Sequence, residues 1–212
     1  MSGHHTEEKV PRAMQTDLRY HDLVPLLSQG WYGDNVIDSY FELLHKRSTI
    51  YASLEPSLEV LVTKLYTKLV QSGYKGVKRW REKRSIFDHE LVLMPVHLER
   101  HWALLAYHIS ARTVTYYCSL RLNMPNVLLL AKDFIVNEAN AKNITSFNVD
   151  DWTFHQDLKA AQQSNSDDCG AAICLFAEYL SRSKPIPQKM PASDRMRNMQ
   201  MMELLRSDLF YR

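Results

Sequence analysis

The residues best suited to covalent chemistry lie in one short stretch, where a polar segment ends at Cys169 and an apolar run follows. Residues 162–170 read Gln-Gln-Ser-Asn-Ser-Asp-Asp-Cys-Gly, and residues 171–180 have the composition of a buried helix. Asp167 or Asp168 could cap that helix, because a short carboxylate accepts hydrogen bonds from the free N–H groups of a first turn. Cys169 would then stand in the first turn, where the helix dipole favours a thiolate. The pattern predicts a nucleophile.

A base and an oxyanion donor for this nucleophile are also present. His101 opens an apolar strand directly after a polar turn, so a sheet would hold it while it still faces solvent, which suits a general base. With Cys169 it would form a dyad in which imidazole takes the thiol proton. The side-chain amide of Gln163 and the backbone N–H of Cys169 could stabilise the oxyanion of a tetrahedral intermediate. The alternative for the cysteine is an ordinary core residue, and for the histidine a structural role.

The hydrophobic pattern indicates helices and a group of short strands that would position these side chains. Structure is expected to begin near Leu23. Helices are expected from Asp34, as the N-cap, to about 44, then over about 56–71, 126–137, 169–180 and 193–207. Pro56 fits the first turn of the second of these and Gly73 would end it. Runs rich in β-branched and aromatic residues predict strands at 91–98, 102–109, 113–117 and 152–155.

Composition limits the class of protein. The 212 residues are 45% hydrophobic and 24% charged, which fits one globular domain, expected at 20–212 after a flexible polar leader at 1–19. The formal net charge of +2 gives no general attraction to nucleic acid, and no apolar run approaches the roughly 20 residues of a membrane span. Three cysteines without a secretory signal predict free thiols in a reducing compartment, the nucleus or the cytoplasm. No cofactor or metal is expected, and the chain is expected to be a monomer.

A basic run over residues 75–84, which contains Trp80, has two interpretations. It is either a solvated surface anchored by the tryptophan or a nucleic-acid patch, and the first is favoured.

Taken in order along the chain, several motifs resemble those of the SUMO-specific, or ubiquitin-like-specific, cysteine proteases of the papain-like superfamily. The first is Trp31-Tyr32-Gly33-Asp34, similar to the family's W-L-N-D, and the stretch before the family's catalytic histidine is similar to Val77-Lys78-Arg79-Trp80 and Met94-Pro95-Val96-His97-Leu98. The next are His101-Trp102-Ala103-Leu104, similar to H-W-[ACS]-L, and residues 162–170, similar to Q-Q-x-N-x-x-D-C-G. The last, Met196 to Leu205, is similar to the family's closing helix. The resemblance covers about residues 20–212. It implies an α+β papain-like fold, with a short mixed sheet packed against helices.

The resemblance also implies catalytic roles, with one departure. Cys169 corresponds to the nucleophile, His101 to the base and Gln163 to the oxyanion-hole donor. The family's third catalytic residue is the aspartate of a Y-x-D-S motif, and here residues 116–120 read Tyr-Tyr-Cys-Ser-Leu, with Cys118 seventeen residues after the histidine. In a serine-protease triad the loss of such an acid costs about 10⁴ in rate. A cysteine nucleophile tolerates the loss better, because its thiol is more acidic than a hydroxyl, so reduced activity is expected.

The substrate side follows from the same resemblance. Trp31 and Trp102 would clamp the Gly-Gly tail of the modifier, because a residue without a Cβ atom passes most easily between two indoles; core packing is the alternative for both. Asp34 falls where the family contacts a basic residue of the modifier. The expected function is a thiol peptidase that cleaves after the Gly-Gly terminus of SUMO or a related modifier. The alternatives are a weak or inactive homologue that binds the modifier, and a protease for another modifier such as Nedd8. No nucleic-acid or membrane partner is expected.

Overall fold

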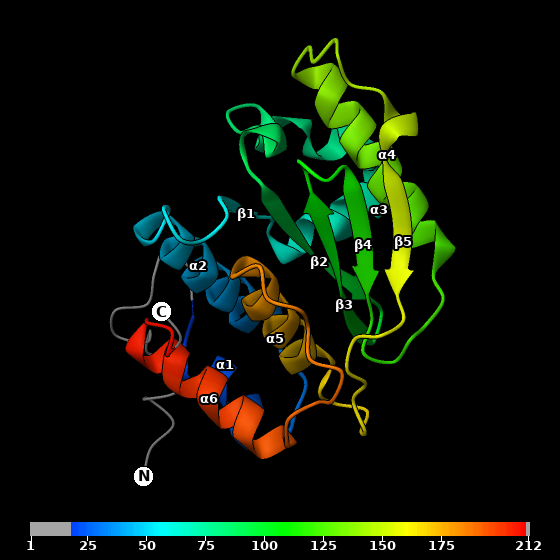
Figure 1. Ribbon diagram of the computed structural model, residues 1–212. Helices are drawn as coiled ribbons and strands as arrows, with labels where there is room; N and C mark the ends of the chain where they lie inside the picture. Colours follow the sequence, from blue (N-terminus) through cyan, green and yellow to red (C-terminus); the bar gives the residue numbers. More distant parts are fainter. Residues whose placement is uncertain (1–17, 211–212) are drawn as a thin grey trace.

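A five-stranded mixed sheet forms the centre of the computed structural model, which describes residues 18–210 (Figure 1). The strands are β1 (Leu58–Val60), β2 (Leu91–Leu98), β3 (His101–His108), β4 (Thr113–Tyr117) and β5 (Thr153–Asp157), and they lie side by side in that order. The central strands β2, β3 and β4 pair antiparallel, and each edge strand pairs parallel with its neighbour. The predicted α+β fold with a short mixed sheet is therefore confirmed.

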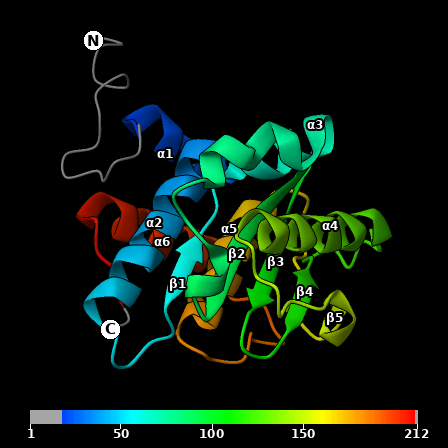
Figure 2. The same ribbon diagram turned by 90° about the horizontal axis from the view of Figure 1, so that it is seen from above.

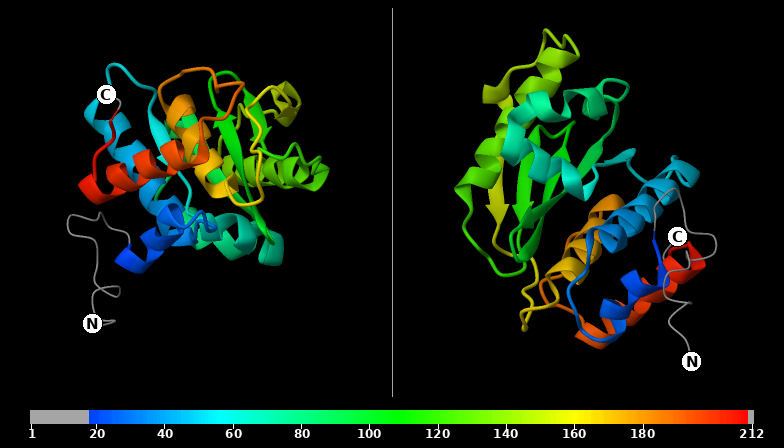
Figure 3. Two further views of the ribbon diagram at one scale, coloured as in Figure 1. Left: turned by 90° about the horizontal axis from the view of Figure 1, so that it is seen from below. Right: turned by 180° about the vertical axis from the view of Figure 1, so that it is seen from behind.

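Helices cover both faces of this sheet. They are α1 (Tyr20–Leu27), α2 (Asp34–Ile50), α3 (Thr63–Arg81), α4 (Pro125–Ala141), α5 (Cys169–Ser181) and α6 (Ser193–Arg206), with short 3₁₀ turns at Ile86–Asp88 and Val149–Asp151. Helices α3 and α4 pack on one face and α5 on the other, and α2, α1 and α6 lie beyond α5 (Figures 1 and 2). The closing helix α6 runs beside α1 and contacts α5 (Figure 3).

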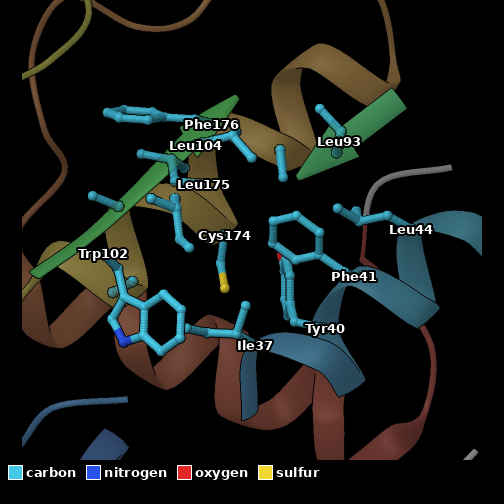
Figure 4. Packing of buried hydrophobic residues seen from close by; sticks show 14 of the residues in the cluster. Ile37, Tyr40, Phe41, Leu44, Leu93, Trp102, Leu104, Cys174, Leu175 and Phe176 are labelled. Atoms are coloured by element: carbon cyan, nitrogen blue, oxygen red, sulfur yellow. The ribbon is translucent and has the colours of Figure 1, made fainter. Parts of the chain in front are cut away.

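The alternation along β3 explains why one strand serves two cores. Trp102 and Leu104 pack with α2 and α5, whereas Ala103 and Leu105 pack with α3 and α4. Successive side chains of a strand point to opposite faces, so a central strand between two helical layers must be apolar on both. Figure 4 shows the α5 side, where Ile37, Tyr40 and Phe41 of α2 meet Trp102, Leu104 and the α5 side chains Cys174 to Phe176.

The helix predicted over 56–71 is wrong at both ends. Residues Leu58–Val60 form β1, parallel to β2, and the helix begins at Thr63. A run of three strand residues is too short to be separated from a helical repeat by periodicity. Gly73 interrupts α3 with φ at +58°, a conformation that costs glycine little, but helical structure resumes and continues to Arg81. Gly33, and not Asp34, occupies the N-cap position of α2.

The remaining segments agree with most of the sequence expectations. The leader expected at 1–19 lies outside the described residues except for Leu18 and Arg19, and Leu18 is buried in the core. Within the basic run, Trp80 is half exposed and Arg81 is buried in ion pairs with Glu59 and Glu138. Over residues 18–210, no helix is long and apolar enough to cross a membrane.

Candidate active site

Topology brings the predicted residues to one edge of the sheet. Strands β4 and β5 are parallel and therefore end at the same edge, and the antiparallel strand β3 begins there. His101 is the first residue of β3, Cys118 directly follows β4, and Cys169 opens α5. A polar segment after β5 leads the chain across this edge to Cys169 and contains Gln163.

Cys169 lies in the first turn of α5 and is 2% exposed. Burial raises the pKa of its thiol, whereas three backbone N–H groups, those of Trp102, Gly170 and Cys169 itself, and the charge of Arg197 act to lower it. The sulfur therefore faces the kind of donors that stabilise negative charge, as a first-turn position predicts. Burial outweighs them, however, so the pKa of the thiol is raised, whereas the sequence favoured a thiolate.

Asp168 occupies the N-cap position of α5, but the predicted side-chain cap is wrong. Its carboxylate instead accepts hydrogen bonds from Asn165 Nδ2 at 2.9 Å, Ser193 Oγ at 2.8 Å and Arg197 Nε at 2.7 Å. Burial acts to raise the pKa of Asp168, but these bonds hold it below its usual value. A buried arginine is a stronger partner for the carboxylate than the helix N–H groups, because it supplies a full opposite charge.

His101 and Cys118 are in direct contact. His101 Nε2 lies 3.2 Å from Cys118 Sγ, and both side chains are buried. Burial lowers the pKa of the imidazole, and its Nε2 partner is a thiol rather than a carboxylate. With Nε2 engaged by Cys118, Nδ1 is the ring nitrogen that remains to act as a base. The backbone N–H that the next residue, Trp102, directs at Cys169 links the two halves of the proposed dyad.

Gln163 is fixed from two sides. Ser119 Oγ donates to its side-chain oxygen, and its backbone N–H donates to the carbonyl of Ser119 at 3.1 Å. Its Nε2 donates to the carbonyl of Asn165 at 2.7 Å. A carboxamide nitrogen carries two N–H donors, so one remains to bind an oxyanion. Gln163 is 7% exposed, and a buried, doubly anchored amide has the rigidity that such a donor needs.

The two tryptophans have different environments. Trp102 is buried, donates from Nε1 to the carbonyl of Tyr32 at 2.9 Å, and stacks on His97 with ring centroids 4.3 Å apart. Trp31 is 41% exposed, and its Nε1 donates to Asp167 Oδ1 at 2.6 Å. The core packing considered from the sequence therefore describes Trp102 but not Trp31.

The surface beside Trp31 is charged. The guanidinium of Arg100 lies 4.9 Å from the centroid of the Trp31 ring, a cation–π contact. Asp34, the first residue of α2, is partly exposed three positions further along the chain. Trp31 and Asp34 are thus at least partly exposed, whereas Trp102 and Cys169 are buried.

The sequence analysis assigned no role to three residues that support the proposed site. Ser119, which anchors Gln163, and Tyr32, whose carbonyl holds Trp102, both stood within quoted motifs without a role of their own. Arg197 gave no signal, because an arginine in a polar helix is normally exposed. Within the described residues, no group of three or more histidine, cysteine, aspartate or glutamate side chains could hold a metal ion.

Comparison with known proteins identifies the family of the chain. Residues 30–209 match the Ulp1 protease family, C-terminal catalytic domain. Sentrin-specific protease 2 of Rattus norvegicus is 33% identical over 183 residues, which cover 85% of this chain and 31% of that protein. Sentrin-specific protease 3 of Homo sapiens is 34% identical over 178 residues, covering 82% and 30%. The chain thus spans about a third of the length of these relatives.

Solved structures show the same fold. The catalytic domain of the Chaetomium thermophilum Ulp1-like SUMO protease gives a TM-score of 0.77 at 20% identity, covering 90% of this chain and 79% of that one. The C-terminal Ulp1 protease domain in complex with Smt3, the yeast ortholog of SUMO, gives 0.76 at 24% identity, covering 89% and 83%. A form of Ulp1 with its catalytic cysteine oxidised to a sulfinic acid gives 0.76 at 25% identity, covering 92% and 87%. The chain therefore belongs to the Ulp1 protease family and carries its C-terminal catalytic domain.

Proposed function

We propose that the chain is a cysteine peptidase that cleaves after the C-terminal Gly-Gly of SUMO or a related ubiquitin-like modifier, in precursor processing or in deconjugation. One observation carries the proposal: Cys169 in the first turn of α5, His101 at the start of β3 and Gln163 before α5 converge on one edge of the sheet. The names of the sentrin-specific relatives and the complex of Ulp1 with Smt3 support the substrate class.

In the proposed mechanism, His101 takes the proton of Cys169 through Nδ1 as the sulfur attacks the carbonyl carbon of the terminal glycine. The carbonyl oxygen becomes an oxyanion, which the free N–H of Gln163 Nε2 and the backbone N–H of Cys169 stabilise. His101 then protonates the leaving amine, and a thioester remains on the sulfur. Water, deprotonated by the same imidazole, hydrolyses the thioester and restores the thiol.

Cys118 takes the place of the family's acid in this scheme. A contact of 3.2 Å with Nε2 can orient the ring and favour the tautomer with a proton on Nε2, which leaves Nδ1 as the base. A neutral thiol cannot stabilise the imidazolium as a carboxylate does. The positioning role of the third residue is thus kept and its electrostatic role is lost, so turnover is expected to be slow.

Substrate selection would come from the indoles. The buried Trp102 and the exposed Trp31 would line the path of the Gly-Gly tail, where a Cβ atom would collide with a ring. Asp34, partly exposed at the start of α2, would pair with a basic residue of the modifier. The three free cysteines suit a reducing compartment, so the proposed peptidase would act in the nucleus or the cytoplasm, as a monomer.

A second candidate function is a catalytically weak homologue that binds modifier conjugates. The observation that favours it is the contact of His101 with a thiol instead of a carboxylate. A panel of SUMO, Nedd8 and ubiquitin derivatives that end in a cysteine-reactive electrophile separates the candidates. Covalent capture of one modifier, lost in Cys169→Ala, supports the peptidase and names its substrate. Tight binding without capture would favour the binding protein, and neither binding nor capture would contradict both.

A further inference from the structure

A single buried arginine connects the two loops of the site. Arg197, on α6, is among the largest fully buried side chains of the described residues. Its Nε donates to Asp168 Oδ1 at 2.7 Å and its Nη2 to the carbonyl of Asp167 at 2.7 Å. Its Nη1 donates to the carbonyls of Gly30 at 2.8 Å and Pro25 at 3.0 Å. The rigid planar fork of a guanidinium thus fixes several acceptors at once.

The acceptors belong to the segments that carry the proposed nucleophile and the exposed tryptophan. Asp167 and Asp168 immediately precede Cys169, and Gly30 immediately precedes Trp31. The indole of Trp31 in turn donates to the side chain of Asp167, which closes a loop of contacts between the two segments.

Tyr32 joins the same assembly. Its ring lies 5.1 Å from the guanidinium of Arg197, and its carbonyl accepts the indole N–H of Trp102. Gly170 packs so closely against it that an added Cβ atom would lie 2.6 Å from Tyr32 Cβ. Through these contacts Arg197 supports the segments of Trp31 and Trp102, which lie on the two sides of the proposed tail-binding path. It also supports the turn before Cys169.

A buried arginine can also be purely structural, and a second buried arginine provides the comparison. Arg47 is buried at the opposite end of α5, where it bonds to Glu178, Ser181 and Glu55. Glu178, Ser181 and Glu55 adjoin none of the predicted site residues, whereas Asp168 and Gly30, which Arg197 binds, lie next to Cys169 and Trp31. The two arginines therefore form a natural pair of test and control.

We infer that Arg197 is a positioning residue of the proposed peptidase, which sets the spacing between Trp31 and Cys169 by holding both loops with one guanidinium. This inference rests on the proposed function. Its charge has a second effect, because it acts against burial to favour the thiolate of Cys169. The two effects are separable: lysine keeps the charge but not the planar fork, and methionine keeps neither.

The test compares Arg197→Lys, Arg197→Met and the control Arg47→Lys. Steady-state kinetics on a substrate with a SUMO tail give kcat and KM. Alkylation of Cys169 by iodoacetamide across a pH series reports the thiol without any modifier, and Cys169→Ala supplies the background. A melting curve gives the Tm of each variant, and each variant is assayed at the same number of degrees below its own Tm. If Arg197→Met does not fold, Arg197→Gln replaces it as the neutral variant.

We expect Arg197→Lys to raise KM and to lower kcat/KM by about 10-fold or more, because small misplacements of reacting groups are costly. Its alkylation midpoint should stay in place. The neutral variant should lose kcat/KM similarly and also move the midpoint to higher pH. Arg47→Lys should lower Tm while KM and the midpoint stay unchanged. Equal kinetic losses in Arg197→Lys and Arg47→Lys, or an unmoved midpoint in the neutral variant, would overturn the inference. Since alkylation needs no turnover, an inactive enzyme with a moved midpoint would count against the proposed function and not against the link to Arg197.

Discussion

Two buried cysteines belong to the proposed site, and they differ in their surroundings. Cys169 begins α5, and backbone N–H groups and the charge of Arg197 surround its sulfur. Cys118 follows β4 and packs among the apolar side chains beneath α3 and α4. Donors that stabilise a thiolate make a cysteine reactive, whereas apolar burial makes it inert. In the proposed mechanism, one cysteine would thus be the nucleophile, whereas the other contacts His101 through its thiol.

This difference has an electrostatic consequence for the pair Cys169–His101. Burial raises the pKa of the thiol and lowers the pKa of the imidazole, so both shifts favour the neutral pair at rest. In a triad with an acid, the carboxylate would oppose this by stabilising imidazolium. With Cys118 in that place, the proposed mechanism would form the ion pair mainly as the sulfur reacts.

The largest expected effect separates the two cysteines directly. Cys169→Ala should abolish cleavage of a SUMO-tailed substrate, because no other side chain supplies the attacking sulfur. The matched variant Cys118→Ala should lose no more than about 10-fold in activity, because it removes the contact that orients His101 but no carboxylate. Activity assays with melting curves check both variants. Cleavage that survives in Cys169→Ala would remove that residue from the mechanism.

The second-largest effect on activity is expected at Gln163, the proposed oxyanion donor. Gln163→Ala should lower kcat by about 10²-fold, the usual loss for one such donor. Its neighbour Gln162 is exposed, so Gln162→Ala should leave kcat unchanged and serves as the control. A loss below about threefold in Gln163→Ala would mean that another group stabilises the oxyanion.

The shape of the tail path gives a third prediction. A modifier that ends in Gly-Ala instead of Gly-Gly should react more slowly by more than about 10-fold, because its methyl group would meet the indoles of Trp31 and Trp102. Single-turnover rates for the two tails measure the effect. Equal rates would indicate an open groove rather than a narrow path.

The pH dependence of labelling distinguishes the two cysteines without any substrate. Because burial raises the pKa of Cys169, its alkylation by iodoacetamide should increase toward alkaline pH. Cys118, packed in the apolar core, should be labelled at least about 10-fold more slowly in the folded protein. Peptide mapping by mass spectrometry measures both rates. Faster labelling of Cys118 than of Cys169 would mean that Cys118 is the more reactive cysteine, which would contradict the assignment.

Much of the arrangement could be predicted from the sequence, because its signals were local. The strands β2, β3 and β4 have β-branched and aromatic runs bounded by polar turns, and their predicted limits are correct to within one residue. Strand β1 was missed because three residues carry too little periodicity, and its pairing with β2 depends on residues distant in the chain.

The supporting contacts of the site were harder to predict. Aspartate commonly caps helices, yet the carboxylate of Asp168 binds Arg197, which lies 29 positions further along the chain. The pairing of Gln163 with Ser119 spans 44 positions. Local propensity contains no information about such partners, so the motifs indicated the proposed reacting groups but not the residues that hold them.

The substitution Cys118→Asp, with the smallest expected effect, tests the comparison of the two cysteines most directly, because it replaces the thiol that contacts His101 by a carboxylate. In Cys118→Asp, a carboxylate would face Nε2 and lie beside the hydroxyl of Tyr116, whose pKa is raised by burial and then by the neighbouring Cys118. The measurement is a pH–rate profile of the parent and the variant, with a melting curve for each. The account predicts a rate about 10-fold higher or more, and loss of the proton from the Cys169–His101 ion pair at a higher pH, because the carboxylate stabilises imidazolium. A variant that is less stable and no faster would contradict the account, since the carboxylate would then be an unpaired buried charge and Cys118 an ordinary core residue.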